Sequence, residues 1–406
     1  MAPLNKTAIL VIHGIGEQNP FDTLDSFARG LKEHYREQGI ELKMQHFMEP
    51  RVSSSGGVWT ESYIRLSPET GENYVDIHEY YWAHLTEEVI SFGEIMQWLR
   101  KTLEGAKYSF EKYKKDFGLS RKGWRNYWWR LNSIIWHVRI FLWMARLALF
   151  ITNVLGFALP WFGTIRKWSE KARGLATPIV VGYIGDIAIY TTIDQKSRHF
   201  NLRKQIIAEA LAMLKAILAQ KDGDQAAYDR VIVAGHSLGS AIAYDTIARL
   251  NLDASLRGAE VLPLDKISAL VTFGSPLDKI AFFFREHVGK EQYIRRQILD
   301  LMHSFRSRWS EVEVEPAKRL LPGTKVDDNV ADLRWLNFFD RNDPISGRLE
   351  FYTKVENHEL KVPGKWPVKG GEKTRARWGV AHTKYWDDPG FYAILVRHLF
   401  SSAPSL

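Results

Sequence analysis

Arg230-Val-Ile-Val-Ala-Gly-His-Ser-Leu-Gly239 carries the strongest structural signal in this sequence. Its beginning, Arg230–Gly235, is an apolar run typical of a strand buried on both faces of a parallel sheet, and a helical pattern follows from Leu238 to Leu250. Between them, residues 235–239 fit the G-x-S-x-G pattern of a tight turn, whose glycines remove Cβ atoms that would clash. The flanking strand and helix disfavour the alternative, a chance glycine-rich turn. We therefore predict that Ser237 is a nucleophile at the carboxyl edge of a sheet.

Other segments continue this alternation of strands and helices. Short apolar runs predict strands, and periodic apolar patterns predict helices. The predicted strands are Thr7–Ile12, Val75–Trp82, Ile267–Phe273 and Leu333–Phe339. The predicted helices are Phe21–Gln38, Leu202–Gln220 and Pro389–Phe400, and the predicted loops include Arg51–Gly57 and Pro363–Arg377. Buried strands that alternate with helices are typical of an α/β protein with a mostly parallel sheet.

The length of the chain is compatible with one large core that carries an insertion. Its 406 residues exceed an average domain, but α/β enzymes with insertions reach this size around a single sheet. We predict a core formed by residues 1–84 and 176–406. Residues 85–175 form a predicted helical insert that is rich in tryptophan.

A serine hydroxyl needs a base, and the acid that orients the base lies between serine and histidine in proteins with this turn. Asp343, in Asp340-Arg-Asn-Asp-Pro-Ile-Ser346, follows a predicted strand, where its carboxylate can reach an imidazole. Asp340 is the alternative acid. Either aspartate could instead cap a turn.

His382 is the predicted base. It lies in Trp378-Gly-Val-Ala-His-Thr-Lys-Tyr-Trp386, immediately before the last predicted helix. The chain has 13 histidines, and most histidines in proteins have structural or surface roles. His358 and His398 are the rivals, but neither opens a loop before a helix in the same way.

His13-Gly14-Ile15-Gly16 follows the first predicted strand, where a second donor to an oxyanion is expected. We predict that the N–H groups of Ile15 and Leu238 form the oxyanion hole, and that His13 orients this loop by hydrogen bonding without acting as a base. Gly14, Gly235 and Gly239 support these turns. Position 19 is Asn, so the loop is not a dinucleotide-binding fingerprint. No motif indicates a metal or another cofactor.

Composition excludes several classes of function. The chain has no cysteine, which rules out a disulfide framework, a thiolate nucleophile and a cysteine-ligated metal. The net charge of +8 suits an anionic partner, but no nucleic-acid-binding motif is present, so we predict no nucleic-acid partner. The N-terminus has no basic region followed by a long apolar segment, so we predict no signal peptide.

The insert combines basic and aromatic residues. Residues 117–169 contain eight Lys or Arg, seven Trp and no Asp or Glu, and Leu147–Ile165 is uncharged over 19 residues. Tryptophan and basic side chains are typical of a helix at a membrane surface, so we favour a lid or anchor that rests on a membrane through about residues 125–168. Two alternatives stay open: residues 147–165 span or re-enter the membrane, or the helices pack on the core or on a partner subunit.

The motifs resemble the lipase branch of the α/β hydrolases and, within it, the DDHD-domain intracellular phospholipases A1. The similar segments are Val11–Gly16, Gly235–Asp245, Thr272–Pro276, Asp343–Ser346 and His382–Trp386, with a looser match at Gly185–Tyr190. They span the chain but cover a minority of it, and the long tryptophan-rich insert departs from the family.

The resemblance implies an α/β-hydrolase fold and hydrolysis of an acyl ester in a glycerophospholipid or related lipid. Ser237, Asp343 and His382 would be nucleophile, acid and base. The expected location is the cytoplasm, with the protein peripheral to a membrane or anchored at it. The alternatives are an inactive hydrolase fold that serves as a membrane interaction protein, and an acyltransferase.

Overall fold

The computed structural model describes a sheet, the helices around it and the loops at its edges. The described residues are 5–14, 19–52, 58–86, 198–257, 263–283, 293–295, 297–298, 306, 316–321, 323, 326–343, 345–362 and 381–400. The chain divides into two compact units, one comprising Met1–Leu85, Arg203–Asp278 and Val288–Leu406, the other Thr86–Leu202 and Lys279–His287. Nearly all described residues belong to the first unit. Apart from residues 85 and 86, the predicted insert 85–175 lies outside the described residues.

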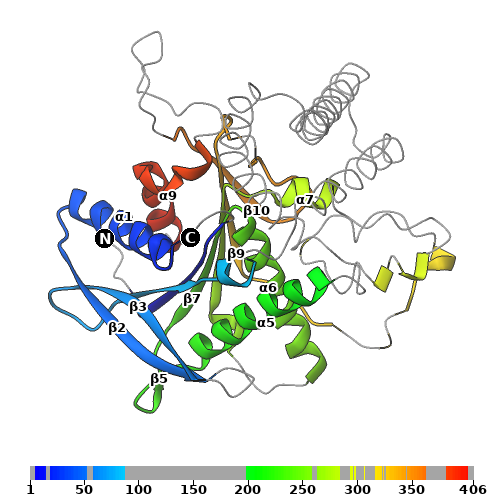
Figure 1. Ribbon diagram of the computed structural model, residues 1–406, viewed down its shortest axis with the longest axis horizontal. Helices are drawn as coiled ribbons and strands as arrows, with labels where there is room; N and C mark the ends of the chain where they lie inside the picture. Colours follow the sequence, from blue (N-terminus) through cyan, green and yellow to red (C-terminus); the bar gives the residue numbers. More distant parts are fainter. Residues whose placement is uncertain are drawn as a thin grey trace, which may run out of the picture. The chain divides into compact units, whose positions relative to one another are not determined.

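An eight-stranded sheet in the order β10-β9-β8-β7-β1-β4-β3-β2 organises the first unit (Figure 1). The strands are β1 (Thr7–Ile12), β2 (Leu42–Val52), β3 (Val58–Pro68), β4 (Val75–Tyr80), β7 (Arg230–His236), β8 (Ile267–Phe273), β9 (Arg334–Phe339) and β10 (Val355–Glu359). Neighbouring strands from β10 to β4 are parallel, whereas β4-β3 and β3-β2 are antiparallel. The predicted α/β class with a mostly parallel sheet is therefore confirmed. A separate ladder joins β5 (Lys221–Asp222) and β6 (Gln225–Ala226).

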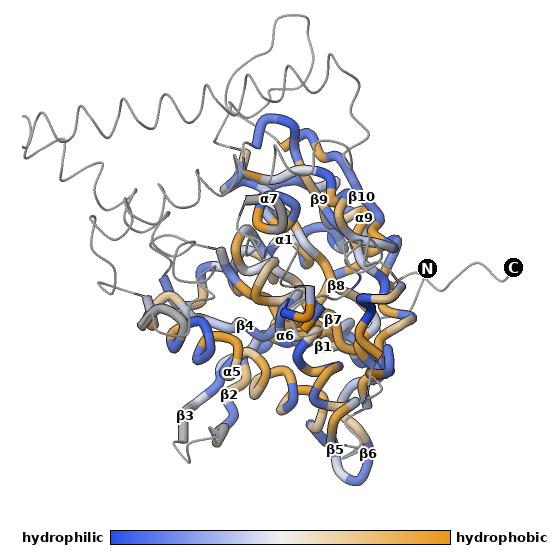
Figure 2. The backbone as a smooth tube through the Cα atoms, turned by 90° about the vertical axis from the view of Figure 1, so that its right-hand side faces the viewer, coloured by the Kyte–Doolittle hydropathy of each residue, from blue (hydrophilic) through white to orange (hydrophobic). Residues whose placement is uncertain are grey.

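The central strands are apolar because both of their faces are covered. All six residues of β1 are buried, and the hydrophobic character of β1, β7 and β8 is visible in Figure 2. The predicted bounds of β1 and β8 match the structure, and those of β7 and β9 differ by one residue. Strand β4 ends at Tyr80 rather than at the predicted Trp82, whose ring stacks on His13 beyond the strand.

Helices cover both faces of the sheet. Figure 1 shows α1 (Asp22–Glu37) beside α9 (Pro389–Leu399) on one face, and α5 (Arg198–Ala219) with α6 (Leu238–Arg257) on the other. Helix α6 continues beyond the predicted end at Leu250. The shorter helical elements are η1 (Ala83–Leu85), η3 (Leu264–Lys266), α7 (Leu277–Phe283), η6 (Pro316–Lys318), η7 (Ala381–Thr383) and η8 (Tyr385–Asp387).

Strands β2, β3 and β10 were not among the sequence predictions. Strands β2 and β3 form a long antiparallel hairpin. The predicted loop Arg51–Gly57 begins with the last two residues of β2, and its remaining residues, 53–57, lie outside the described residues. These two strands carry charged and polar residues among the apolar ones, so neither the uniform run of a buried strand nor a clean alternation marks them. The charged side chains of Glu61 and Arg65 pair with residues of β4 that are distant in the sequence, so their burial could not be predicted from β3 itself.

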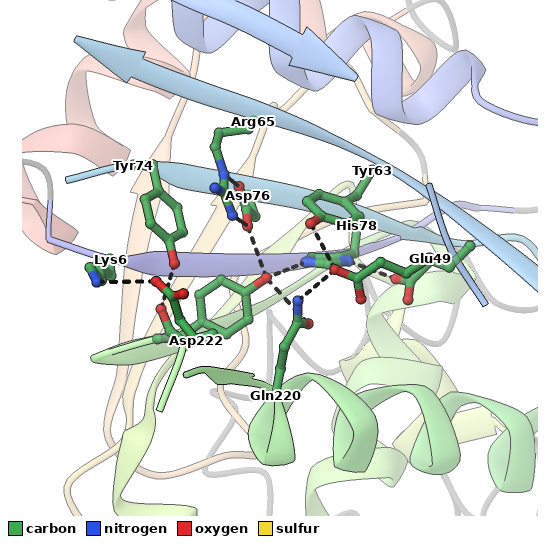
Figure 3. A network of polar contacts seen from close by, with 12 residues as sticks. Lys6, Glu49, Tyr63, Arg65, Tyr74, Asp76, His78, Gln220 and Asp222 are labelled. Carbon is green, nitrogen blue, oxygen red and sulfur yellow. Dashed lines mark hydrogen bonds and ion pairs between the residues drawn. The ribbon is translucent and has the colours of Figure 1, made fainter. Parts of the chain in front are cut away.

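A network of polar side chains attaches this hairpin to the parallel sheet (Figure 3). Arg65 of β3 forms two hydrogen bonds of 2.7 Å with the carboxylate of Asp76 on β4. The hydroxyl of Tyr228 donates to the same carboxylate over 2.9 Å. Two residues further along β4, His78 Nδ1 lies 2.6 Å from Glu61 Oε1, and both residues are buried. Paired in this way, the charges can remain inside the protein.

The helices of the described part of the chain include none with the length and hydrophobicity needed to cross a membrane. The predicted membrane-contacting stretch 125–168 and its uncharged part 147–165 lie outside the described residues. These two predictions therefore stay predictions.

Candidate active site

The turn between β7 and α6 holds Ser237 in a strained backbone conformation. Its φ angle is 52°, in the left-handed region that residues with a Cβ rarely adopt. The N–H of Ser237 donates to the carbonyl of Phe273 at the end of β8, over 3.0 Å. Such strain is kept where the surrounding structure overdetermines it, and it clusters at functional sites.

The two glycines of the turn are required by close backbone approach. A Cβ on Gly235 would lie 2.4 Å from the carbonyl oxygen of Gly239, and a Cβ on Gly239 would lie 2.3 Å from that of Ile12. Neither obstacle is a side chain that could move aside. The local sequence therefore dictates how closely α6 approaches β1 and β7.

Three side chains that are far apart in the sequence converge at this turn. His382 Nε2 lies 2.8 Å from Ser237 Oγ, and His382 Nδ1 lies 2.9 Å from Asp343 Oδ2. Ser237 follows β7, Asp343 follows β9 and His382 lies in η7 just before the last helix. All three are at least 97% buried. The structure thus brings together the three residues that the sequence predicted as nucleophile, acid and base.

The two candidate aspartates have different partners. Asp343 faces His382, and its other carboxylate oxygen accepts the N–H of Ile345 over 2.8 Å. Asp340 accepts the N–H groups of Asn342 and Val362, over 2.7 and 2.8 Å. Asp340 therefore shapes the loops, and the geometry favours Asp343 as the partner of the histidine.

The carboxyl group of Asp343 stays ionised despite its burial. Burial alone raises its pKa, but hydrogen bonds from His382, Ile345 N–H and Tyr385, with the charge of the imidazolium, outweigh burial and lower the pKa to about 2. The carboxylate can therefore orient the imidazole and stabilise the imidazolium that forms when His382 accepts a proton.

A second histidine contacts the backbone of His382. His236, next to Ser237, is buried, and its Nε2–H donates to the backbone carbonyl of His382 over 2.8 Å. Burial, and to a smaller extent His382, lower the pKa of His236 to about 3, so its ring stays neutral. Sequence reasoning did not single out His236, since a histidine inside the G-x-S-x-G pattern gives no signal of which group it contacts.

Only one of the two predicted oxyanion donors lies within the described residues. Leu238 begins α6, so its N–H has no acceptor within the helix and is available beside Ser237. Ile15, the other predicted donor, lies outside the described residues. Its neighbour Gly14 lies close to Ser237: a Cβ at Gly14 would be 2.8 Å from the Cβ of Ser237.

His13 has the contacts of a residue that orients this loop. Its Nε2 accepts the N–H of Trp82 over 3.0 Å, so its Nδ1–H donates to the carbonyl of Gly14, over 2.7 Å. Burial lowers the pKa of His13 to about 4, which keeps the ring neutral. The predicted hydrogen-bonding role of His13 agrees with this geometry.

The rival histidines lie elsewhere, in a cluster that could in principle bind a metal. Ligand atoms of Glu356, His358 and His398 lie within 4.8 Å of one another, on β10 and at the end of α9. Arg334 lies among them, with Nε 2.7 Å from Glu356 Oε1 and Nη2 2.7 Å from His398 Nδ1. A guanidinium thus already provides the positive charge that these groups attract.

No protein-family model matches the sequence, and no curated protein matches it. A hydroxyl hydrogen-bonded to an imidazole, which is itself hydrogen-bonded to a buried carboxylate, can be deprotonated as it attacks an electrophilic carbon.

Proposed function

We propose that this chain is a serine hydrolase with an α/β-hydrolase fold that cleaves carboxylic esters, and that its substrates are the acyl esters of lipids. One observation carries the proposal: the Ser237, His382 and Asp343 side chains form a continuous hydrogen-bonded series of 2.8 and 2.9 Å at the carboxyl ends of parallel strands. The order of serine, acid and histidine along the chain is the order expected for this fold.

The reaction proceeds through an acyl-enzyme. His382 accepts the proton of Ser237 as Oγ attacks the ester carbonyl, and Asp343 stabilises the imidazolium. The negative charge that develops on the carbonyl oxygen is stabilised by the N–H of Leu238 and by the predicted donor Ile15. Collapse of the tetrahedral intermediate expels the alcohol, which takes the proton from His382. Water, activated by the same imidazole, then releases the carboxylic acid and regenerates Ser237.

Two sequence features support lipid esters as substrates. The segments around Ser237, Asp343 and His382 resemble those of the DDHD-domain phospholipases A1. The acid-free stretch 117–169, with its seven tryptophans and eight basic residues, suits contact with an anionic lipid surface. The location that fits this proposal is the cytoplasmic surface of a membrane.

Covalent labelling by a fluorophosphonate probe tests the proposed chemistry. The folded wild-type protein, in detergent or liposomes, should be labelled at Ser237, and Ser237→Ala should lose both labelling and ester turnover. Ser275→Ala is the matched control, because Ser275 is a buried serine at the end of the neighbouring strand β8. Failure of the folded wild-type protein to react would contradict the proposal and favour an inactive hydrolase fold.

A substrate panel tests the class of ester. Glycerophospholipids in liposomes should be cleaved faster than short soluble esters, and the products identify the bond that breaks. Formation of a new ester when an alcohol is added would indicate acyl transfer instead of hydrolysis. A marked preference for soluble esters would contradict the lipid part of the proposal without affecting the ester chemistry.

A further inference from the structure

The hydroxyl of Tyr385 touches the same carboxylate oxygen as the proposed base. It donates to Asp343 Oδ2 over 2.9 Å, and its oxygen accepts the N–H of Asp340 over 3.0 Å. Ser346 Oγ lies 2.8 Å from the same hydroxyl and is placed to donate to it. A phenol has one proton to donate and two acceptor positions, so these three contacts use all of its hydrogen-bonding capacity.

The chain connects Tyr385 directly to the base. His382 in η7 and Tyr385 in η8 are three residues apart, and both direct polar atoms at Asp343 Oδ2. The ring of Tyr385 is fully buried, and burial, together with the charge of Asp343, raises its pKa well above the ordinary value. The phenol therefore keeps its proton and remains a donor.

We infer that Tyr385 is a positioning residue of the proposed triad: its hydroxyl fixes the Asp343 carboxylate in the orientation that His382 needs and shares that carboxylate's charge with the imidazole. This inference rests on the proposed function. Tyr385 does not reach Ser237 in the contacts described above, so it acts on the reaction through Asp343.

Loss of the hydroxyl has two separate effects. The loop from Asp340 to Ser346 loses its anchor, so Asp343 is held less firmly and attack by Ser237 slows. The charge of Asp343 is also no longer shared with the phenol, so it stabilises the imidazolium of His382 more strongly. Protonated His382 then persists to higher pH, and the pH at which the nucleophile becomes active rises.

The ionisable side chains that contact His382 or its carboxylate partner keep a fixed protonation state near neutral pH. Asp343 has its pKa lowered to about 2 and His236 to about 3, while that of Tyr385 is raised. None of these three changes protonation in the range where an exposed histidine titrates. A shift of the acid limb between the wild type and Tyr385→Phe therefore reports on how strongly Asp343 interacts with the imidazole of His382.

The experiment measures the rate at which a fluorophosphonate labels Ser237 in the folded full-length protein as a function of pH. Tyr385→Phe should slow labelling about tenfold, the effect of losing one hydrogen bond to a charged group, and should move the acid limb to higher pH. Tyr392→Phe is the matched control, because it removes another buried phenol, on α9, that donates to the carbonyl of Ser26. It should leave the rate and the limb as in the wild type.

The other outcomes of this experiment either overturn the role of Tyr385 or contradict the proposed function itself. Slower labelling with an unmoved acid limb, or an equal effect of Tyr392→Phe, would reduce Tyr385 to an ordinary structural residue and overturn the inference. If Tyr385→Phe does not fold, a fluorinated tyrosine at position 385 preserves the packing and donates more strongly, so it should move the limb to lower pH, and an unmoved limb overturns the inference. If the wild-type protein is not labelled at all, the proposed function itself has failed.

Discussion

Two buried pairs of histidine and carboxylate can be compared within the described residues, and one of them, His382 with Asp343, belongs to the proposed active site. His382 Nδ1 contacts Asp343 over 2.9 Å, and its Nε2 contacts Ser237 Oγ over 2.8 Å. His78 Nδ1 contacts Glu61 over 2.6 Å, and its Nε2 lies 3.2 Å from the hydroxyl of Tyr228. On geometry alone, each set is a hydroxyl, an imidazole and a carboxylate in series.

The third member of each set makes the difference. The hydroxyl of Tyr228 donates to Asp76 over 2.9 Å, and burial, reinforced by the charge of Asp76, raises its pKa far above the ordinary value. Its proton is therefore committed to a carboxylate. The hydroxyl of Ser237 faces His382, on a strained turn at the carboxyl ends of the strands, where α/β proteins bind their ligands. Position and the third partner thus distinguish the proposed catalytic pair from a buried imidazole-carboxylate pair that only holds strands together.

The largest effect that separates the two pairs is expected for Asp343→Asn. Loss of the carboxylate leaves the imidazole in the wrong tautomer, so ester turnover should fall on the order of 10⁴-fold while the far-UV circular dichroism stays native. Asp340→Asn is the matched control in the same loop, and it should change stability more than turnover. Retained activity in Asp343→Asn with loss in Asp340→Asn would assign the acid to the other residue.

The second pair is expected to affect stability instead. His78→Leu leaves the Glu61 carboxylate buried without its imidazole, and the free energy of unfolding should fall by about 3–5 kcal/mol. Adding Glu61→Leu should recover most of this loss, because a well-packed apolar pair can replace a buried ionic one. Denaturant titration measures both values. Fluorophosphonate labelling of Ser237 per folded molecule should not change. A loss of labelling in folded His78→Leu would contradict a purely structural role for the His78–Glu61 pair.

Glu79 is a carboxyl group that burial affects differently from Asp343 and Glu61, each of which contacts a histidine. It faces Phe21 and Thr23 at the beginning of α1, and burial raises its pKa from 4.5 to about 7. The folded protein therefore holds this proton more tightly than the unfolded chain, so stability is lost as the pH rises from 4.5 through 7. Glu79→Gln removes that loss. It should raise the free energy of unfolding by up to about 3 kcal/mol above pH 7 and change it little at acidic pH.

Denaturant titrations of the wild type and Glu79→Gln at an acidic and a slightly alkaline pH measure this difference. Asp343 should show the opposite sign, because its pKa is lowered from 3.8 to about 2. Its contribution to stability is present above pH 3.8 and is lost as the pH falls towards 2. A Glu79→Gln variant with the same stability gain at both pH values would show that ionisation of Glu79 is not the cause.

Much of the sheet could be predicted because its central strands carry a local signal. The apolar runs of β1, β7, β8 and β9 reflect burial on both faces, and that requirement is visible in each segment by itself. Strands β2 and β3 carry no such signal, because the buried Glu61 and the half-buried Arg65 are charged residues that pair with His78 and Asp76 on β4. Sequence periodicity does not show which distant residue will neutralise a charge.

The sequence by itself determined the turn at Ser237, since the glycines at 235 and 239 and the flanking strand and helix are local requirements of backbone geometry. Only the tertiary structure showed that Asp343, and not Asp340, contacts His382. It likewise showed that His382, and neither His358 nor His398, contacts Ser237, and that Tyr385 contacts Asp343. Those contacts depend on which side chains meet across 39 to 145 residues of chain. Such meetings are set by packing of the whole sheet, and no local pattern contains them.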